Sequence, residues 1–354
     1  MKLEKVSLVA LISIMTVACN GGGGSSSQVG GIAYSSNFDP NPYPQAKEYP
    51  TPPVWAIPDL VRNSANYGAK IAYGDSDSEQ VKRLTAQLNI GNQYICSAAP
   101  VYYDGKGTWL VTAAHCLVKD KTDENNLQST ELVSSKEILV ETTINGEWNA
   151  NNVTAIFVPR DYCYGASFSS FAGCPNFTSD YDSGATGEGN DIGLIYAEGK
   201  VGLPEDYAKL APQSEFPEAY TMAPILSVGN GITENNGSAG TTYYVTNYLY
   251  RKTDNEGYHL LYSSYFNDSP DNMGYTSLVC NGDSGGGDYY WNGSNWILIA
   301  THSFAPLEGC GKVYNYLPSG STNVGYYYDW IKLIIDSKNP ASTCNLSSSN
   351  CVYR

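Results

Sequence analysis

The chain has 354 residues, and its 35 acidic and 20 basic residues give a formal net charge of −15. This length allows one double-layered β domain with extensions, and 35 glycines and 30 tyrosines favour an extracellular β-rich domain with many turns. The acidic balance argues against nucleic-acid binding, because no basic run exists to neutralise phosphates.

The first 19 residues are typical of an export signal. Lys2 and Lys5 precede an apolar stretch that is too short for a permanent membrane helix. Small residues then lead to Cys19, a pattern similar to that of bacterial lipoproteins, whose signal is cleaved before an acylated cysteine. An ordinary secretory signal is the alternative. We expect an exported protein, an outer-membrane lipoprotein or cell-surface protein, that contacts the membrane only through an N-terminal lipid.

Residues 20–70 combine a Gly/Ser-rich tether with a proline-rich stretch, which indicates an extended segment before the folded domain. Regular patterning begins near Ile71. Short apolar runs punctuated by Gly, Asn and Asp predict an all-β sandwich or barrel. These runs are Leu88 to Ile95, Ala98 to Tyr103, Trp109 to Ala113, Ile138 to Thr143, Asp191 to Tyr196, Thr241 to Tyr250 and Trp296 to Ala300.

The C-terminal part differs from the rest in its periodicity. Residues 326–335 place their apolar side chains on one helical face, which predicts an amphipathic helix. Residues 339–354 then form a short tail.

The chain has nine cysteines. If Cys19 is acylated, the other eight can pair in 105 ways. Neighbour order favours four bridges in an oxidising compartment: Cys96–Cys116, Cys163–Cys174, Cys280–Cys310 and Cys344–Cys351. No CxxC pair occurs and none of the three histidines has ligand spacing, so we expect neither a metal site nor a cofactor. The acidic stretch at 120–131 is read as a solvated loop, with calcium binding as the alternative.

Three separated segments together supply the groups of a nucleophilic site. Ser284 lies between glycines in Gly-Asp-Ser-Gly-Gly, and a serine hydroxyl needs a base to take its proton. His115, in Ala-Ala-His-Cys, can supply that base. Asp191 begins an apolar strand, where it can orient the histidine. Asp180 and Asp182 are weaker candidates for the acid, because no apolar strand follows them.

These three segments, in this order, resemble the chymotrypsin-like (trypsin-type) serine proteases over about Ile71 to Asp336. The resemblance implies an all-β fold of two antiparallel six-stranded β-barrels, at about 71–205 and 206–325, followed by an α-helix. It also implies a monomeric serine endopeptidase acting on proteins or peptides. Gly282 and Ser284 would supply the oxyanion amides.

The same resemblance implies zymogen activation. An activating protease would cut after Lys70, and the new ammonium on Ile71 would pair with Asp283. The alternative is that Asp283 pairs internally. With no cysteine between Asn20 and Ile95, such a cut would also detach the protease from its lipid anchor.

The resemblance also bears on which residue the enzyme prefers before the cleaved bond. Leu278, followed by Val279, stands where the family has its pocket floor, which argues against Arg/Lys preference. His302 and Ser303 lie on the expected pocket wall, where some relatives use a histidine to bind glutamate, although a packed histidine is the more ordinary reading. Either Thr301 or Ser303 would help to hold Asp191. Two other functions remain open: a silent surface-binding protein on this scaffold and an esterase of the same fold.

Overall fold

The computed structural model describes residues 48–53, 78–122, 128–160, 162–164, 169–170, 190–218, 221, 223–232, 239–253, 260–264, 279–304, 319–346 and 351–353. Within these ranges, no helix combines the length and apolar character needed to cross a membrane.

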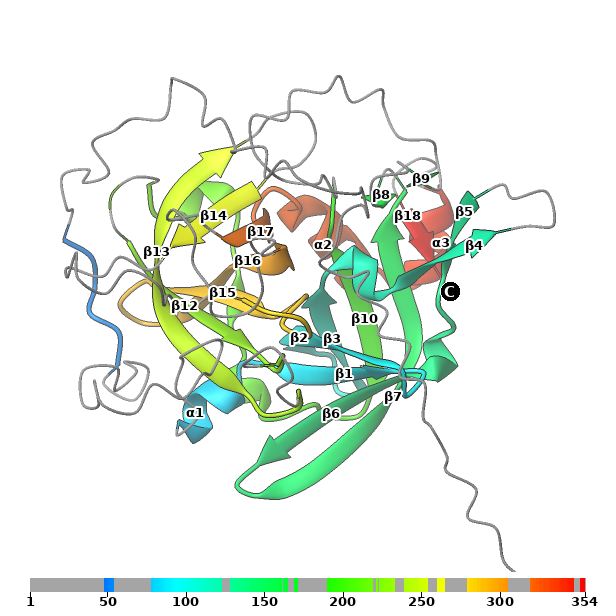
Figure 1. Ribbon diagram of the computed structural model, residues 1–354, viewed down its shortest axis with the longest axis horizontal. Helices are drawn as coiled ribbons and strands as arrows, with labels where there is room; N and C mark the ends of the chain where they lie inside the picture. Colours follow the sequence, from blue (N-terminus) through cyan, green and yellow to red (C-terminus); the bar gives the residue numbers. More distant parts are fainter. Residues whose placement is uncertain are drawn as a thin grey trace, which may run out of the picture.

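The first sheet closes into a six-stranded antiparallel barrel (Figure 1). Its strand order is β10-β3-β2-β1-β6-β7, and pairing of β10 with β7 closes the ring. Side chains alternate between buried and partly buried along β1, while all of β3 is buried. The strands are β1 (Ala86–Ile90), β2 (Tyr94–Tyr103), β3 (Gly107–Thr112), β6 (Ile138–Ile144), β7 (Glu147–Pro159) and β10 (Gly193–Glu198).

The second sheet closes in the same way, in the order β16-β15-β12-β13-β14-β17, where β16 pairs with β17. β11 (Lys209–Leu210) adds to β16 as a parallel strand. The barrel strands are β12 (Pro224–Gly229), β13 (Tyr243–Thr253), β14 (Leu260–Ser264), β15 (Gly287–Trp291), β16 (Trp296–Phe304) and β17 (Ser319–Asn323). Two closed barrels leave few open strand edges and confirm the predicted fold class.

Smaller elements lie around the barrels. Two hairpins pair β4 with β5 and β8 with β9. Their bounds are Val118–Thr122, Gln128–Leu132, Cys163–Tyr164 and Ser169–Ser170. α1 (Glu79–Lys82) begins at Ser78, whose hydroxyl caps it. Among the described residues, four 3-10 turns span Ala114–Cys116, Ser135–Glu137, Pro204–Asp206 and Gln213–Glu215.

The main core lies where the two barrels face each other. It joins Trp109 and Val111 of β3 to Leu226 of β12 and Tyr289 of β15. α2 (Tyr328–Ile335) confirms the predicted C-terminal helix and packs Ile331, Ile334 and Ile335 into the same cluster. Burying apolar surface at about 25 cal/mol per Å² favours holding the two barrels together.

One predicted strand is two strands. The run from Leu88 to Ile95 is interrupted at residues 91–93, which form the turn between β1 and β2. Gly91 and Asn92 have φ values of 60° and 54°, a left-handed conformation that a strand cannot contain. The turn brings Ile90 opposite Tyr94 in the antiparallel ladder.

The C-terminal tail is ordered against the first barrel. α3 (Pro340–Leu346) follows α2, and β18 (Cys351–Tyr353) then pairs with β7. Cys344 is disulfide-bonded, while the side chain of Cys351 lies outside the description. The segment predicted as a short tail with a small disulfide loop thus also extends the first sheet.

Residues 48–53, from the predicted N-terminal extension, lie on the second barrel. The Tyr49 ring packs edge-on against Tyr290 at 6.0 Å between centroids, and its hydroxyl bonds to Thr221. Tyr49 also contacts the apolar cluster inside this barrel. A part of the extension therefore packs against the domain that it precedes.

Candidate active site

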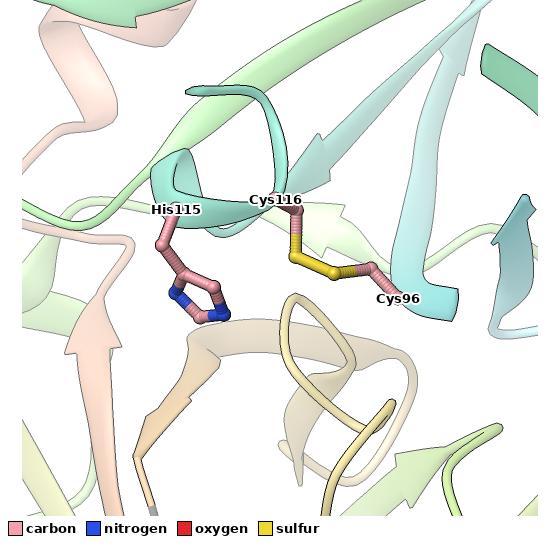
Figure 2. A group of neighbouring side chains, drawn as sticks. All are labelled: Cys96, His115 and Cys116. Atoms are coloured by element: carbon pink, nitrogen blue, oxygen red, sulfur yellow. A yellow bond between two sulfur atoms is a disulfide. The ribbon is translucent and has the colours of Figure 1, made fainter. Parts of the chain in front are cut away.

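His115 lies in the short 3-10 turn directly after β3. The turn is fixed to β2 by the Cys96–Cys116 disulfide, one of the four predicted bridges (Figure 2). The imidazole and the two sulfur atoms lie within 4.8 Å of one another. This cluster is unsuited to a metal, because both sulfurs are bonded to each other and cannot act as thiolates.

Asp191 is fully buried beside His115. Asn190, at φ 58°, makes the turn that leads into β10. The Asp191 carboxylate accepts the His115 backbone N–H at 2.9 Å, and its other oxygen lies 2.8 Å from His115 Nδ1. Ser303 also donates its hydroxyl to that second oxygen, at 2.5 Å.

These contacts decide the charge of Asp191. Burial alone raises the pKa of this carboxyl, but the adjacent His115 and the hydrogen bonds from His115 and Ser303 outweigh burial. The pKa of Asp191 therefore lies below its usual value, and the group is a carboxylate at neutral pH. Of the two residues considered for holding this aspartate, Ser303 makes the contact.

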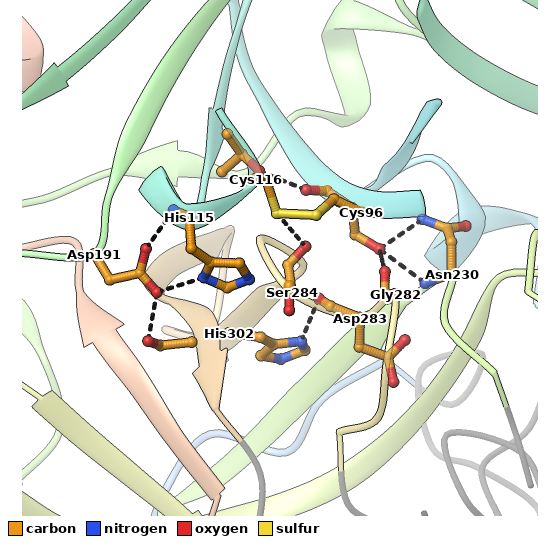
Figure 3. The surroundings of a disulfide bond; sticks show 12 residues. Cys96, His115, Cys116, Asp191, Asn230, Gly282, Asp283, Ser284 and His302 are labelled. Carbon is orange, nitrogen blue, oxygen red and sulfur yellow. Dashed lines mark hydrogen bonds and ion pairs between the residues drawn. A yellow bond between two sulfur atoms is a disulfide. The ribbon is translucent and has the colours of Figure 1, made fainter. Parts of the chain in front are cut away.

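Ser284 lies in a tight loop between Cys280 and β15. Figure 3 shows the His115 ring between the Asp191 carboxylate and Ser284. The Ser284 carbonyl accepts the Ser97 N–H of β2 at 2.8 Å, so the loop is fastened to the first barrel. Gly285 has φ 82°, and a Cβ there would come within 2.1 Å of Thr112 Oγ1. Only glycine therefore fits after the serine.

The amides of this loop fall into two groups. The N–H groups of Cys280, Asp283, Gly285 and Gly286 each donate a hydrogen bond within the protein. In the part of the chain that the structure describes, the N–H groups of Gly282 and Ser284 donate none. Two unused donors around a serine suit a developing oxyanion.

Asp283 points away from Ser284 into the second barrel (Figure 3). Its two carboxylate oxygens accept the N–H groups of Gly231, at 2.7 Å, and Cys280, at 2.8 Å. Burial raises the pKa of Asp283 to about 6, although the charge of nearby His302 and these amide bonds lower it in part. In this structure Asp283 is therefore held by two backbone amides of the protein. This agrees with the alternative in which Asp283 pairs internally and not with an ammonium on Ile71.

His302 is buried in β16 below the loop, 1% exposed. Its Nε2 lies 3.0 Å from Asp288 Oδ1, and its Nδ1 lies 3.3 Å from the Asp283 carbonyl oxygen. Asp288 also accepts hydroxyl hydrogens from Ser227 and Ser321. Sequence analysis singled out His302 but not its pairing with Asp288, because Asp288 lies in an ordinary strand and its partners come from other strands.

Several predicted site residues lie outside the described residues: Lys70, Ile71, Asp180, Asp182, Leu278, Cys174 and Cys310. Val279 is described and buried, and Cys280 is disulfide-bonded. The side chain of Cys163 is not described.

Ser97 is a second residue that motif analysis missed. Its hydroxyl donates to the Gly282 carbonyl at 2.9 Å and accepts the Asn230 N–H at 2.9 Å, so it links strand β2 to two loops of the site. Figure 3 shows Asn230 and Gly282 with the hydrogen bonds that they make here.

Comparison with known proteins finds one family match and a similar solved structure. The solved structure titled "Atomic resolution structure of HBP" is similar at 14% identity and a TM-score of 0.49, covering 76% of this chain and 98% of that one. No curated protein matches the chain. The family model described as Trypsin matches residues 167–331, which include Asp191 and Ser284 and begin after His115. The similarity to the trypsin family, the chymotrypsin-like serine peptidases, is therefore shown for residues 167–331.

Proposed function

We propose that this protein is a serine endopeptidase that acts through His115, Asp191 and Ser284. The observation that carries the proposal is the buried His115–Asp191 pair next to a serine loop with two unused amides. A peptidase needs all of these parts at once: a base, its orienting acid, a nucleophile and an oxyanion site.

In this mechanism the Ser284 hydroxyl attacks a peptide carbonyl, and His115 Nε2 takes its proton. Asp191 holds the Nδ1 proton of His115 and stabilises the imidazolium without accepting the proton. The oxyanion forms beside the amides of Gly282 and Ser284. His115 then protonates the leaving amine, and water hydrolyses the acyl-enzyme. No cofactor takes part.

The test is labelling by a fluorophosphonate probe, which reacts only with an activated serine. The chain is probed before and after cleavage at Lys70; we expect the cut wild-type chain to label, and the cut Ser284→Ala and His115→Ala chains to lose the label. A wild-type chain that never labels even after cleavage at Lys70, while a known trypsin labels beside it, favours the silent surface-binding protein. An esterase would also label, so a peptide-library profile must then show cleavage of amide bonds.

Specificity and processing belong to the same proposal. We expect cleavage after residues other than Arg or Lys, because Leu278 and Val279 offer no acidic pocket floor. We also expect an activating cut after Lys70 and an exported, lipid-anchored precursor that works as a monomer on protein or peptide substrates. Release by that cut would require Tyr49 to leave Tyr290, to which it packs. Membrane fractionation before and after cleavage distinguishes release from retention.

A further inference from the structure

His302 and Asp288 form a buried pair that the proposed mechanism does not use. Both are almost fully buried, at 1% and 2% exposure, directly below the loop that carries Ser284. A buried charge pair without a role costs stability, because both groups lose their hydration. The contacts of the pair indicate what it does.

The partners of Asp288 define its charge state. Oδ1 accepts from the Ser227 hydroxyl and lies 3.0 Å from His302 Nε2, while Oδ2 accepts the Ser321 hydroxyl at 2.6 Å. The Ser227 oxygen itself accepts the Asn247 side-chain N–H at 2.9 Å, so its own hydrogen is free to point at Asp288. Burial raises the pKa of Asp288, but the charge and hydrogen bond of His302 and the bonds from Ser227 and Ser321 outweigh burial and lower it below its usual value, so Asp288 is a carboxylate and His302 Nε2 donates to it.

The second ring nitrogen must also carry a proton. His302 Nδ1 faces the Asp283 carbonyl oxygen at 3.3 Å, and a carbonyl oxygen only accepts hydrogen bonds. The ring is therefore an imidazolium. Burial lowers the pKa of His302, but the charge and hydrogen bond of Asp288, with a smaller contribution from Asp283, raise it above its usual value.

The Asp283 carbonyl belongs to the peptide unit whose N–H is that of Ser284. A trans peptide is planar, so its C=O and N–H point in opposite directions and are polarised together. His302 thus lies at one end of this peptide, and the oxyanion site lies at the other. The carbonyl also accepts the Gly286 N–H at 2.7 Å. A charged donor polarises the peptide more than a neutral one and makes its N–H a stronger donor.

The His302 backbone holds the same loop. Its N–H donates to the Gly286 carbonyl and its carbonyl accepts the Gly285 N–H, both at 2.8 Å. Ring and backbone together therefore fix the loop on both sides of Ser284.

We propose that Asp288 and His302 are a second buried pair of positioning residues, which orient and polarise the Ser284 amide of the oxyanion hole. The inference rests on the proposed function. It differs from a role of His302 in binding a substrate carboxylate, because both ring nitrogens are engaged inside the protein. Neither residue touches the substrate, so the pair affects the reaction only through the peptide.

The kinetic test compares wild type with His302→Gln and with the neutral double variant Asp288→Asn/His302→Gln, which leaves no lone buried charge. Thr322→Val is the matched control, because it removes a buried hydroxyl from β17 that has no hydrogen-bond partner among the described residues. Since loss of a whole oxyanion donor lowers kcat by about 10²–10³-fold, we expect a smaller loss of about tenfold to hundredfold with KM little changed. Affinity for a peptidyl boronate, which mimics the tetrahedral state, should fall by the same factor.

Two kinetic results would overturn the inference. One is an unchanged kcat in the folded double variant. The other is a loss confined to substrates with an acidic residue before the cut, which would mean that His302 reads the substrate.

A second measurement tests the pair without relying on activity. The amide signal at position 284 is followed by NMR against pH in a 15N-labelled Ser284→Ala chain, which cannot digest itself. The titratable described groups facing His302 are Asp283 and Asp288. We expect one transition near the Asp283 pKa of about 6 and a second, on the alkaline side, from His302.

The variants assign the alkaline transition. It should vanish in His302→Gln and move to lower pH in Asp288→Asn, because the anion that holds the His302 proton is gone. An amide signal with no alkaline transition refutes the inference. If the transition is present but wild type never reacts with fluorophosphonate, the proposed function is wrong while the His302 coupling stands.

Discussion

The buried carboxyl of Asp283 gives a quantitative prediction of how stability depends on pH. Its pKa rises from 3.8 to about 6 on folding. At about 1.4 kcal/mol per pH unit, ionising this group in the folded protein costs about 3 kcal/mol of the free energy of unfolding.

The sign follows from which state holds the proton more tightly. The folded state does, so the contribution of Asp283 to stability is highest below pH 3.8. It falls as the pH rises to about 6 and is constant above that. Asp283→Asn removes this dependence, and it also removes the smaller contribution of the Asp283 charge to the raised pKa of His302.

The assay is urea unfolding, followed by tryptophan fluorescence, of uncut wild type and Asp283→Asn at pH 4, 5, 6 and 7, both in a Ser284→Ala background. As the pH rises from 4 to 7, we expect the wild type to lose about 2 kcal/mol of unfolding free energy relative to Asp283→Asn. A difference that is flat, or that runs the other way, refutes the reasoning about burial. In the chain cut after Lys70, a pairing of the Ile71 ammonium with Asp283 would reverse the slope, so the same assay tests the proposed activation.

Three further predictions concern the site. Ser303→Ala removes a charge-assisted bond to Asp191 worth about 1.5–3 kcal/mol, and kcat/KM should fall about tenfold to hundredfold; equal kinetics would contradict this role. The double change Cys96→Ser/Cys116→Ser opens a bridge with a sequence separation of 20, so urea unfolding should show a loss of about 3 kcal/mol. Gly285→Ala places a Cβ 2.1 Å from a threonine oxygen, so we expect a chain that fails to fold or to label; a fully labelled variant would show that the loop is wrongly placed.

The parts of the site predicted from the sequence are those with local signals. His115, Asp191 and Ser284 stand out because each lies in a short motif whose residues the local backbone requires. Gly285, for example, follows the serine because its φ and its close neighbours admit no side chain. The barrels were predictable because alternating burial follows from strand geometry.

The missed features arise from contacts between residues far apart in the chain. Asp288 and Ser321 lie 33 residues apart, and neither stands in a motif. The turn at Gly91 and Asn92 interrupts an apolar run, so the sequence pattern predicts one strand where β1 and β2 are separate. A segment as short as β18 carries no periodicity, and only its pairing with β7 makes it a strand.

That pairing has a consequence for the order in which the protein can fold. β18 places Val352 opposite Val158 and covers the end of β7, beyond the residues that pair with β6. An uncovered strand edge is a template for pairing with another chain. Because β18 follows the second barrel in the sequence, this edge of β7 stays unpaired during synthesis until the second barrel has been made. β18 can therefore pair with β7 only after the second barrel has been synthesised, and a product truncated before Cys351 would expose this strand edge to its own copies.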